Sequence, residues 1–133
     1  MKKRILLVLS LIFVLGVHTA SAALTEQQSE EILKFTKDFI MNESKNSGIF
    51  SLQHPETGQE EWFELYGILG NIKEAEGGYF VMVDVDIFGY PDENYLLYFI
   101  VKTVDGQYKL DEIRIGPRFE RKGQATQKLS IPE

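Results

Sequence analysis

Two carboxylates on one predicted strand are the residues of this chain best suited to chemistry. Asp84 and Asp86 are two positions apart in segment 79–88, so an extended backbone places them on one face, about 7 Å apart. Paired carboxylates can bind calcium or transfer protons. The spacing matches a calcium loop only in part, because Phe88 stands where an oxygen ligand is needed and Tyr95 replaces the bidentate glutamate. We therefore expect a solvated strand end and no metal site.

Other chemistry-bearing side chains are scarce. The chain has no cysteine, which excludes disulfides, cysteine-ligated metals and thiol nucleophiles. Of its two histidines, His18 lies in an N-terminal segment that we expect to be removed, and His54 precedes Pro55 in a predicted turn. A lone turn histidine is typical of a protein surface, and a triad would need a nucleophile and an acid around it. We expect no catalytic residue, no cofactor and, from the net charge of −6, no nucleic-acid partner.

The N-terminus has the three parts of a secretory signal peptide. Basic residues 2–4 precede 13 largely apolar residues, 5–17, and Ala20-Ser21-Ala22 has the small-x-small pattern of a cleavage site. The apolar run is shorter than the roughly 20 residues of a membrane span. Cleavage after Ala22 takes away three of 14 basic residues and none of 20 acidic ones, which leaves 111 residues with a net charge of −9. We expect a periplasmic or secreted protein without a lasting membrane anchor.

One helix is predicted at the start of the mature chain. Thr25 followed by Gln28 is a capping box, and Ile32, Phe35 and Phe39 form part of an apolar stripe at helical spacing. Gly48 is suited to cap the C-terminal end. The pattern predicts a helix over 26–45 with one buried face.

The chain after Gly48 is predicted as about five antiparallel strands. Turn-forming residues separate apolar, alternating segments near 49–53, 60–72, 79–88, 94–104 and 107–115, with a bend or bulge at Gly67 or Gly70 in the second strand. Residues 90–93 are expected to form a turn, and 74–78 a polar loop. Residues 23–116 form a single α+β domain in this prediction, one helix on a curved meander, and 117–133 are a C-terminal tail.

Asp105-Gly106 is the strongest local signal. It predicts a two-residue type I′ hairpin, which fixes the pairing on either side. Outward from the turn, Val101 faces Leu110, but unbroken pairing would set Phe99 opposite Glu112. One extra residue at Asp111-Glu112 would restore apolar pairs, so we predict a β-bulge there.

This element order resembles the cystatin-like and NTF2-like group of small α+β domains, and it is similar to small exported bacterial proteins of the same layout. Segment 77–83 is similar to the apolar strand that follows the first inhibitory hairpin of cystatins. The inhibitory motif Gln-x-Val-x-Gly is replaced here by residues 74–77, and the Pro-Trp of the second hairpin by residues 104–106. The resemblance implies a curved sheet around a helix, without a complete inhibitory wedge.

The face of the sheet opposite the helix is the candidate binding surface. It should alternate apolar with polar residues if it faced water alone, and it does so only weakly. Either it meets a partner or ligand, or residues 116–133 fold over it, or its side chains coat a curved sheet. Its residues are Trp62, Tyr66, Phe80, Met82, Asp84, Leu96, Tyr98 and Ile100.

The leading hypothesis is an exported, soluble, non-catalytic binding or interaction module. Its partner would be an unidentified protein or small ligand, or a second copy of the chain in a homodimer. The alternative is a small ligand-binding or isomerase-type protein with an NTF2-like cavity, in which Tyr66 and Asp84 form an acid/base pair. A cystatin-like protease inhibitor is a third reading.

Overall fold

The computed structural model describes residues 24–75, 77–117 and 126–132. Helix α2 (Glu26–Glu43) begins at the predicted capping box, in which the N–H of Gln28 donates to Thr25 Oγ1 (3.1 Å) and the N–H of Thr25 donates to Gln28 Oε1 (3.0 Å). The helix ends two residues earlier than predicted, with Ser44 as its C-cap. Gly48, the predicted cap, lies further on at a φ of +80°, and its carbonyl accepts the N–H of Leu65.

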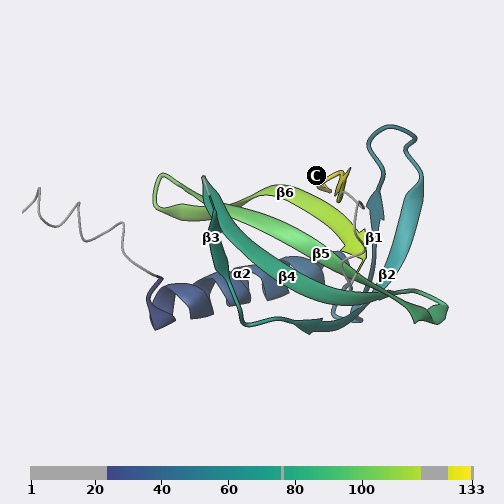
Figure 1. The fold of residues 1–133 in the computed structure, drawn as a ribbon, viewed down its shortest axis with the longest axis horizontal. Coiled ribbons are helices and arrows are strands. Elements are labelled where there is room, and N and C mark those ends of the chain that lie inside the picture. Colours follow the sequence, from purple (N-terminus) through teal and green to yellow (C-terminus); the bar gives the residue numbers. More distant parts are fainter. Residues whose placement is uncertain (1–23, 76, 118–125, 133) are drawn as a thin grey trace, which may run out of the picture.

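The strands form one antiparallel sheet in the order β1-β2-β4-β5-β6-β7, and β3 pairs with β4 (Figure 1). Two of the strands were not predicted. Strand β3 (Lys73–Ala75) lies largely in the expected polar loop, and β7 (Gln127–Leu129) lies in the expected tail. The bounds are β1 (Ile49–Gln53), β2 (Glu60–Ile68), β3 (Lys73–Ala75), β4 (Gly78–Ile87), β5 (Tyr90–Val104), β6 (Gln107–Pro117) and β7 (Gln127–Leu129).

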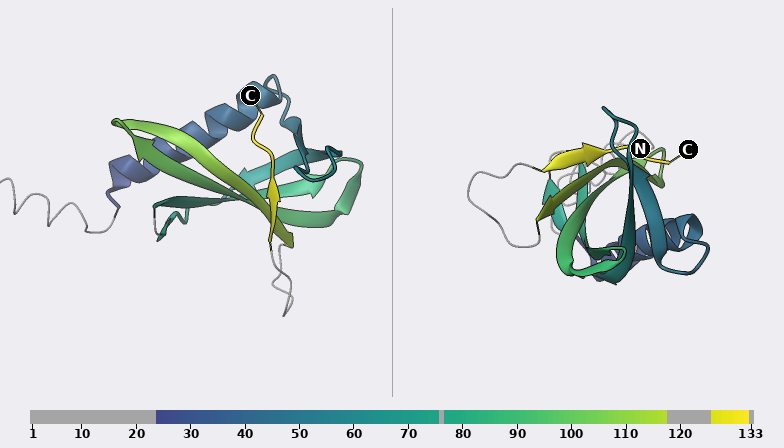
Figure 2. Two further views of the ribbon diagram at one scale, coloured as in Figure 1. Left: turned by 90° about the horizontal axis from the view of Figure 1, so that it is seen from above. Right: turned by 90° about the vertical axis from the view of Figure 1, so that its right-hand side faces the viewer.

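The sheet curls until its first and last strands meet. Gln53 at the end of β1 forms a β-bridge with Ser130, whose N–H donates to the Gln53 carbonyl at 2.8 Å. Figure 2 shows the strands curving around the molecule with α2 on one side. Residues 127–130, which were expected in the C-terminal tail, therefore belong to the sheet, whereas residues 118–125 lie outside the described residues.

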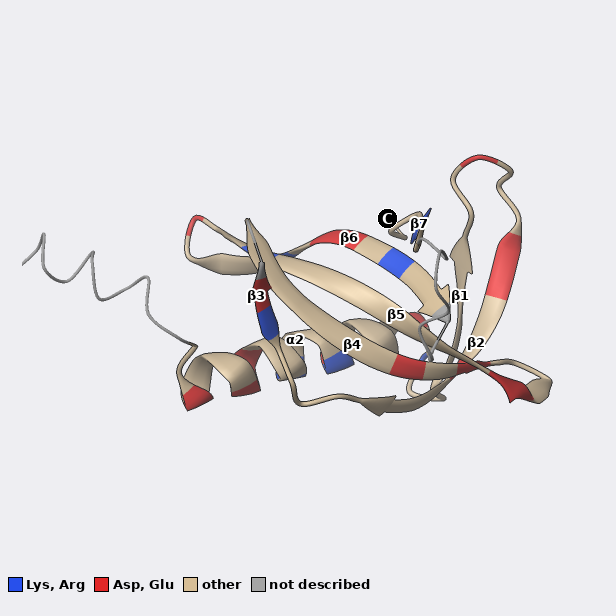
Figure 3. Cartoon of the chain, viewed as in Figure 1, with Lys and Arg blue, Asp and Glu red and all other residues tan. Residues whose placement is uncertain are grey.

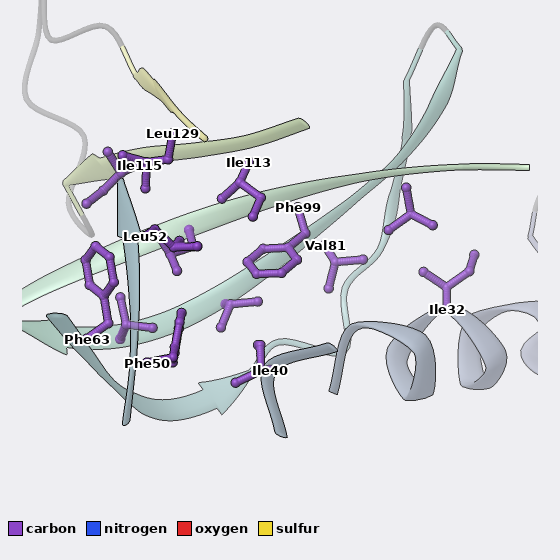
Figure 4. Close-up of a cluster of buried hydrophobic side chains, with 14 residues drawn as sticks. Ile32, Ile40, Phe50, Leu52, Phe63, Val81, Phe99, Ile113, Ile115 and Leu129 are labelled. Carbon is purple, nitrogen blue, oxygen red and sulfur yellow. The ribbon is translucent and has the colours of Figure 1, made fainter. Parts of the chain in front are cut away.

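The core lies between α2 and the inner, concave face of the sheet. The helix contributes Ile32 and Ile40, both fully buried, and Phe39 packs edge-on against Phe99 of β5 with ring centroids 5.7 Å apart. Leu129 of β7 is fully buried in the same cluster (Figure 4). Apolar residues at alternate strand positions supply the remaining core side chains, as period-two patterning requires: Phe50, Leu52, Phe63, Val81, Val83, Val85, Leu97, Val101, Ile113 and Ile115.

The β5–β6 hairpin is built as predicted. Asp105 (φ +52°) and Gly106 (φ +78°) both adopt the left-handed conformation of a type I′ turn. Val101 faces Leu110, and the next pair is Ile100 with Glu112, so Asp111 is the extra residue. The bulge brings Ile113 opposite Phe99 and Ile115 opposite Leu97, which confirms the predicted register. A second bulge lies between Leu65 and Gly67 in β2, at one of the two glycines where a bend was expected.

The β4–β5 connection differs from the prediction. The turn is at Phe88-Gly89, where Gly89 has a φ of +89°, and Tyr90 already pairs with Ile87. The predicted turn at 90–93 is instead an irregularity in β5, because three residues intervene before Asn94 pairs with Asp86. Proline has no N–H to donate, so Pro91 suits such a break in the ladder.

No helix among the described residues is long and apolar enough to cross a membrane. The predicted signal peptide, residues 1–22, lies outside the described residues.

Candidate functional site

Strand β4 separates the core from the candidate surface. Val81, Val83 and Val85 point to the helix side and are fully buried. Asp84 and Asp86 alternate with these valines, so they lie on the opposite face, which we call the outer face. The candidate face identified from the sequence is therefore the outer face of the sheet.

The outer face divides into a covered half and an accessible half. The register of β4 and β5 makes direct neighbours of Phe80 and Ile100, of Met82 and Tyr98, and of Asp84 and Leu96. All six of these side chains are half-buried or buried, with Leu96 and Ile100 each only 8% exposed.

Trp62 and Tyr66 of β2 form the accessible half. Their side chains are 49% and 74% exposed, against 4% for Asp84. Of the eight predicted surface residues, these two are the ones most open to a partner.

A polar network on β6 holds the start of the last strand against the covered half. The Nε of Arg114 donates to Thr126 Oγ1 (2.7 Å) and its Nη2 to the Thr126 carbonyl (2.9 Å), while Nη1 pairs with Glu112 (3.0 Å). A Cβ on Gly116 would lie 3.0 Å from Thr126 Cγ2 and 3.3 Å from the Tyr98 ring. Thr126 and the Tyr98 ring therefore both lie close to Gly116, on this part of the outer face.

Asp84 and Asp86 are not the solvated strand end that the sequence led us to expect. They are only 4% and 9% exposed, on a strand that pairs with β2 on one side and β5 on the other. Asp86 accepts a hydrogen bond from the Asn94 amide. Asp84 faces the β2 bulge, with Gly67 as its register partner and Tyr66 as the extra residue. The two residues of the predicted acid/base pair therefore lie on neighbouring strands at the bulge, Tyr66 74% exposed and Asp84 4% exposed.

Sequence reasoning missed Glu64 and Phe88. Glu64 lies between Trp62 and Tyr66 on the exposed side of β2 and faces Asp86. Phe88 is 48% exposed, and its N–H donates to the carbonyl of Trp62 at 2.9 Å. The signal was available in the sequence as the alternation Trp62-x-Glu64-x-Tyr66, which a period-two strand presents on one side.

The charges are strongly segregated along the chain. Between Lys45 and Lys102 there are ten acidic residues and a single basic one, Lys73. This interval forms β1 to β4 and most of β5. In Figure 3, β2, one end of β4 and the β4–β5 hairpin carry acidic colour, whereas α2, β3 and β6 carry both acidic and basic colour. The accessible half of the outer face is consequently acidic.

His54 is held at the base of the β1–β2 hairpin. Its Nε2 lies 2.9 Å from Glu61 Oε2, and both side chains are about one-third exposed or less. The imidazole is therefore partly covered rather than a fully exposed turn residue. Among the described residues, no group of three or more His, Asp or Glu side chains is arranged to hold a metal ion.

Comparisons of the chain with protein family models, with curated proteins and with solved structures gave no match.

Proposed function

We propose that this protein is an exported, non-catalytic interaction module that binds its partner through the accessible half of the outer face, centred on Trp62 and Tyr66. The observation that carries the proposal is the exposure of these two large aromatic side chains, 49% and 74%, on a strand whose other face is buried. Monomeric proteins rarely leave aromatic side chains grouped in water without a binding role. Aromatic residues are enriched where proteins meet partners.

The architecture supports a binding role over a cavity enzyme. The space between α2 and the sheet holds a cluster of 14 buried apolar side chains, and the carboxylates of β4 lie on the other face. We extend the proposal to the fold and the location. The chain would be a variant of the cystatin-like or NTF2-like layout, with helix and curled sheet as the shared features, and would work in the periplasm or outside the cell.

A site-specific photocrosslinker tests the surface. Benzoylphenylalanine replaces Tyr66 in one variant and Val104, which is 44% exposed at the far hairpin, in a matched control. Both variants are irradiated in the cells that produce the protein. We expect a discrete adduct from position 66 that the control lacks, and its loss when Trp62→Ser is added.

The mass of the adduct identifies the partner class. An adduct of twice the chain's mass, also seen with purified protein, would identify a second copy. Identical adduct patterns from positions 66 and 104, or no adduct from either, would contradict the proposed surface.

A further inference from the structure

Strand β2 presents an aromatic–acidic–aromatic row to the solvent. Trp62, Glu64 and Tyr66 are all exposed, and they alternate with inward-facing Phe63 and Leu65. Trp62 and Glu64 lie on the outer face about 7 Å apart, the repeat of side chains on one face of a strand, and Tyr66 follows as the extra residue of the β2 bulge.

The neighbouring strands add negative charge and apolar surface to this row. On β4, Asp86 is opposite Glu64, and Asp84 is opposite the bulge that carries Tyr66. On β1, Ser51 is opposite Trp62 and Ile49 is opposite Glu64, so the register places no basic residue beside the row on either side.

Glu64 lies directly opposite Asp86, and two carboxylates at such a position lower the stability of the sheet. The ion pairs among the described residues are Lys34–Asp38, His54–Glu61, Lys102–Asp111, and Glu112 with Arg114 and Lys128; none includes Glu64. Local rules of stability are commonly broken where a surface serves binding.

A carboxylate between two aromatic groups is suited to a cationic side chain. Guanidinium and ammonium groups bind over the faces of tryptophan and tyrosine, and they pair with carboxylates. The row runs along β2 from Trp62 to Tyr66, so an extended segment laid along it would present a different side chain to each aromatic group, which one small cation could not do.

We propose that the Trp62–Glu64–Tyr66 row binds arginine or lysine side chains of an extended cationic polypeptide segment. This proposal rests on the function proposed above and names the class of partner. Glu64 would accept hydrogen bonds from one cationic side chain, while Trp62 and Tyr66 would each stack on a different one, and Asp84 and Asp86 would add a long-range attraction.

The single tryptophan makes the surface directly observable, because Trp62 is the only one in the chain. The probe is a short synthetic peptide in which arginine alternates with serine, titrated into the full mature chain while tryptophan emission is recorded. A second peptide carries citrulline, the uncharged isostere, in place of each arginine. We expect saturable binding of the arginine peptide, weakened by salt, and no comparable response to the citrulline peptide.

Matched variants separate the row from the overall charge. Glu64→Gln and Tyr66→Ser should each weaken binding about two- to fivefold, the effect of one exposed cation–π or ion-pair contact. Glu56→Gln removes the same charge from the exposed β1–β2 turn and should leave affinity unchanged. Glu64→Gln should not lower the unfolding temperature, since it relieves a like-charge pair.

Several outcomes would overturn the proposal. If the citrulline peptide bound as tightly as the arginine peptide, or if Glu56→Gln and Glu64→Gln weakened binding of the arginine peptide equally, the row would not be a site for cationic side chains. Competition by free arginine amide as strong as by the peptide would exclude a polypeptide segment. If the arginine peptide bound only after Arg118, Arg121 and Lys122 were all changed to serine, the row would bind the chain's own basic residues rather than a partner. A specific crosslink from position 66 without arginine-peptide binding would leave the proposed function standing and refute this partner class alone.

Discussion

The phenol of Tyr108 joins the described helix to the sheet. Its hydroxyl donates to Glu31 at 2.8 Å, and its ring packs against Phe35 with centroids 6.2 Å apart. Burial, and then the hydrogen bond and negative charge of Glu31, raise the pKa of Tyr108 from 10.0 to about 12. The neutral phenol is therefore the form that the folded protein favours.

Tyr108→Phe is expected to lower the free energy of unfolding by about 0.5–1.5 kcal/mol at neutral pH, because one hydrogen bond is lost. A raised acid pKa stabilises the fold below the unfolded pKa, and this contribution is lost as pH rises through the folded value. The difference between wild type and Tyr108→Phe should thus be constant up to about pH 10 and shrink towards about pH 12. Urea unfolding followed by circular dichroism at pH 8, 10 and 11 measures it.

Tyr66→Phe is the control for this experiment, since the Tyr66 ring is 74% exposed. It should leave the free energy of unfolding unchanged both at neutral pH and in the alkaline range of the titration. If the free energies of unfolding of Tyr108→Phe and of the wild type differed by the same amount at every pH, the link between Tyr108 and Glu31 would be contradicted.

At the scale of elements, some local signals predicted the structure, whereas the expected turn at 90–93 and the expected helix cap at Gly48 were wrong. The Thr25–Gln28 capping box and the Asp105-Gly106 turn each depend on residues close together in sequence. The bulge at Asp111 was predicted from the strand register that the Asp105-Gly106 turn fixes. The alternation of β4 also did not show that Asp84, on the outer face, would be only 4% exposed, because the exposure of a side chain depends on contacts that are distant in sequence.

Strand β7 was missed for a related reason. Three residues carry little periodicity, and only Leu129 of Gln127–Leu129 is apolar. Its pairing with β6 is stabilised by contacts far away in sequence, including Leu129 beside Ile113 and Thr126 on the Arg114 guanidinium. The accessible surface was half predicted: Trp62 and Tyr66 were identified, Glu64 was missed although it lies two positions from each of them, and Phe88 was missed because it lies at the β4–β5 turn.

Leu129→Ala tests whether β7 is part of the cooperative core. Leu129 is fully buried, so truncation should lower the free energy of unfolding by about 2–5 kcal/mol, as large-to-small changes in cores do. Lys128→Ala, at the adjacent exposed position, should cost much less. The two are compared by urea unfolding. Equal stability of Leu129→Ala and wild type would contradict the closure of the sheet by its last strand, and a chain truncated after Gly116 should fold poorly for the same reason.

At the scale of the whole molecule, charge and chain order divide the surface into two parts. The interval between Lys45 and Lys102, which forms β1 to β4 and most of β5, has ten acidic residues and one basic residue, whereas four of the eight basic residues of the described chain lie on α2 and β6. Such a distribution orients an approaching cationic partner before contact, and it does so less at high ionic strength. The salt dependence expected for the arginine peptide is therefore a property of the molecule as well as of the Trp62–Glu64–Tyr66 row.

The proposed export predicts a mature protein that begins at Ala23. When the full chain is produced in a bacterium, intact mass spectrometry of the periplasmic and external fractions should find it without residues 1–22. Ala20→Arg with Ala22→Arg should leave the precursor uncut, because signal peptidase needs small residues at these two positions. Ser21→Gln, between them, should be cleaved normally. An uncut wild-type chain in the cytoplasm would contradict export.

The functional protein would in that case have a net charge of −6 rather than −9, because three basic residues would remain at the N-terminus. Its cationic partner would then have to be sought inside the cell.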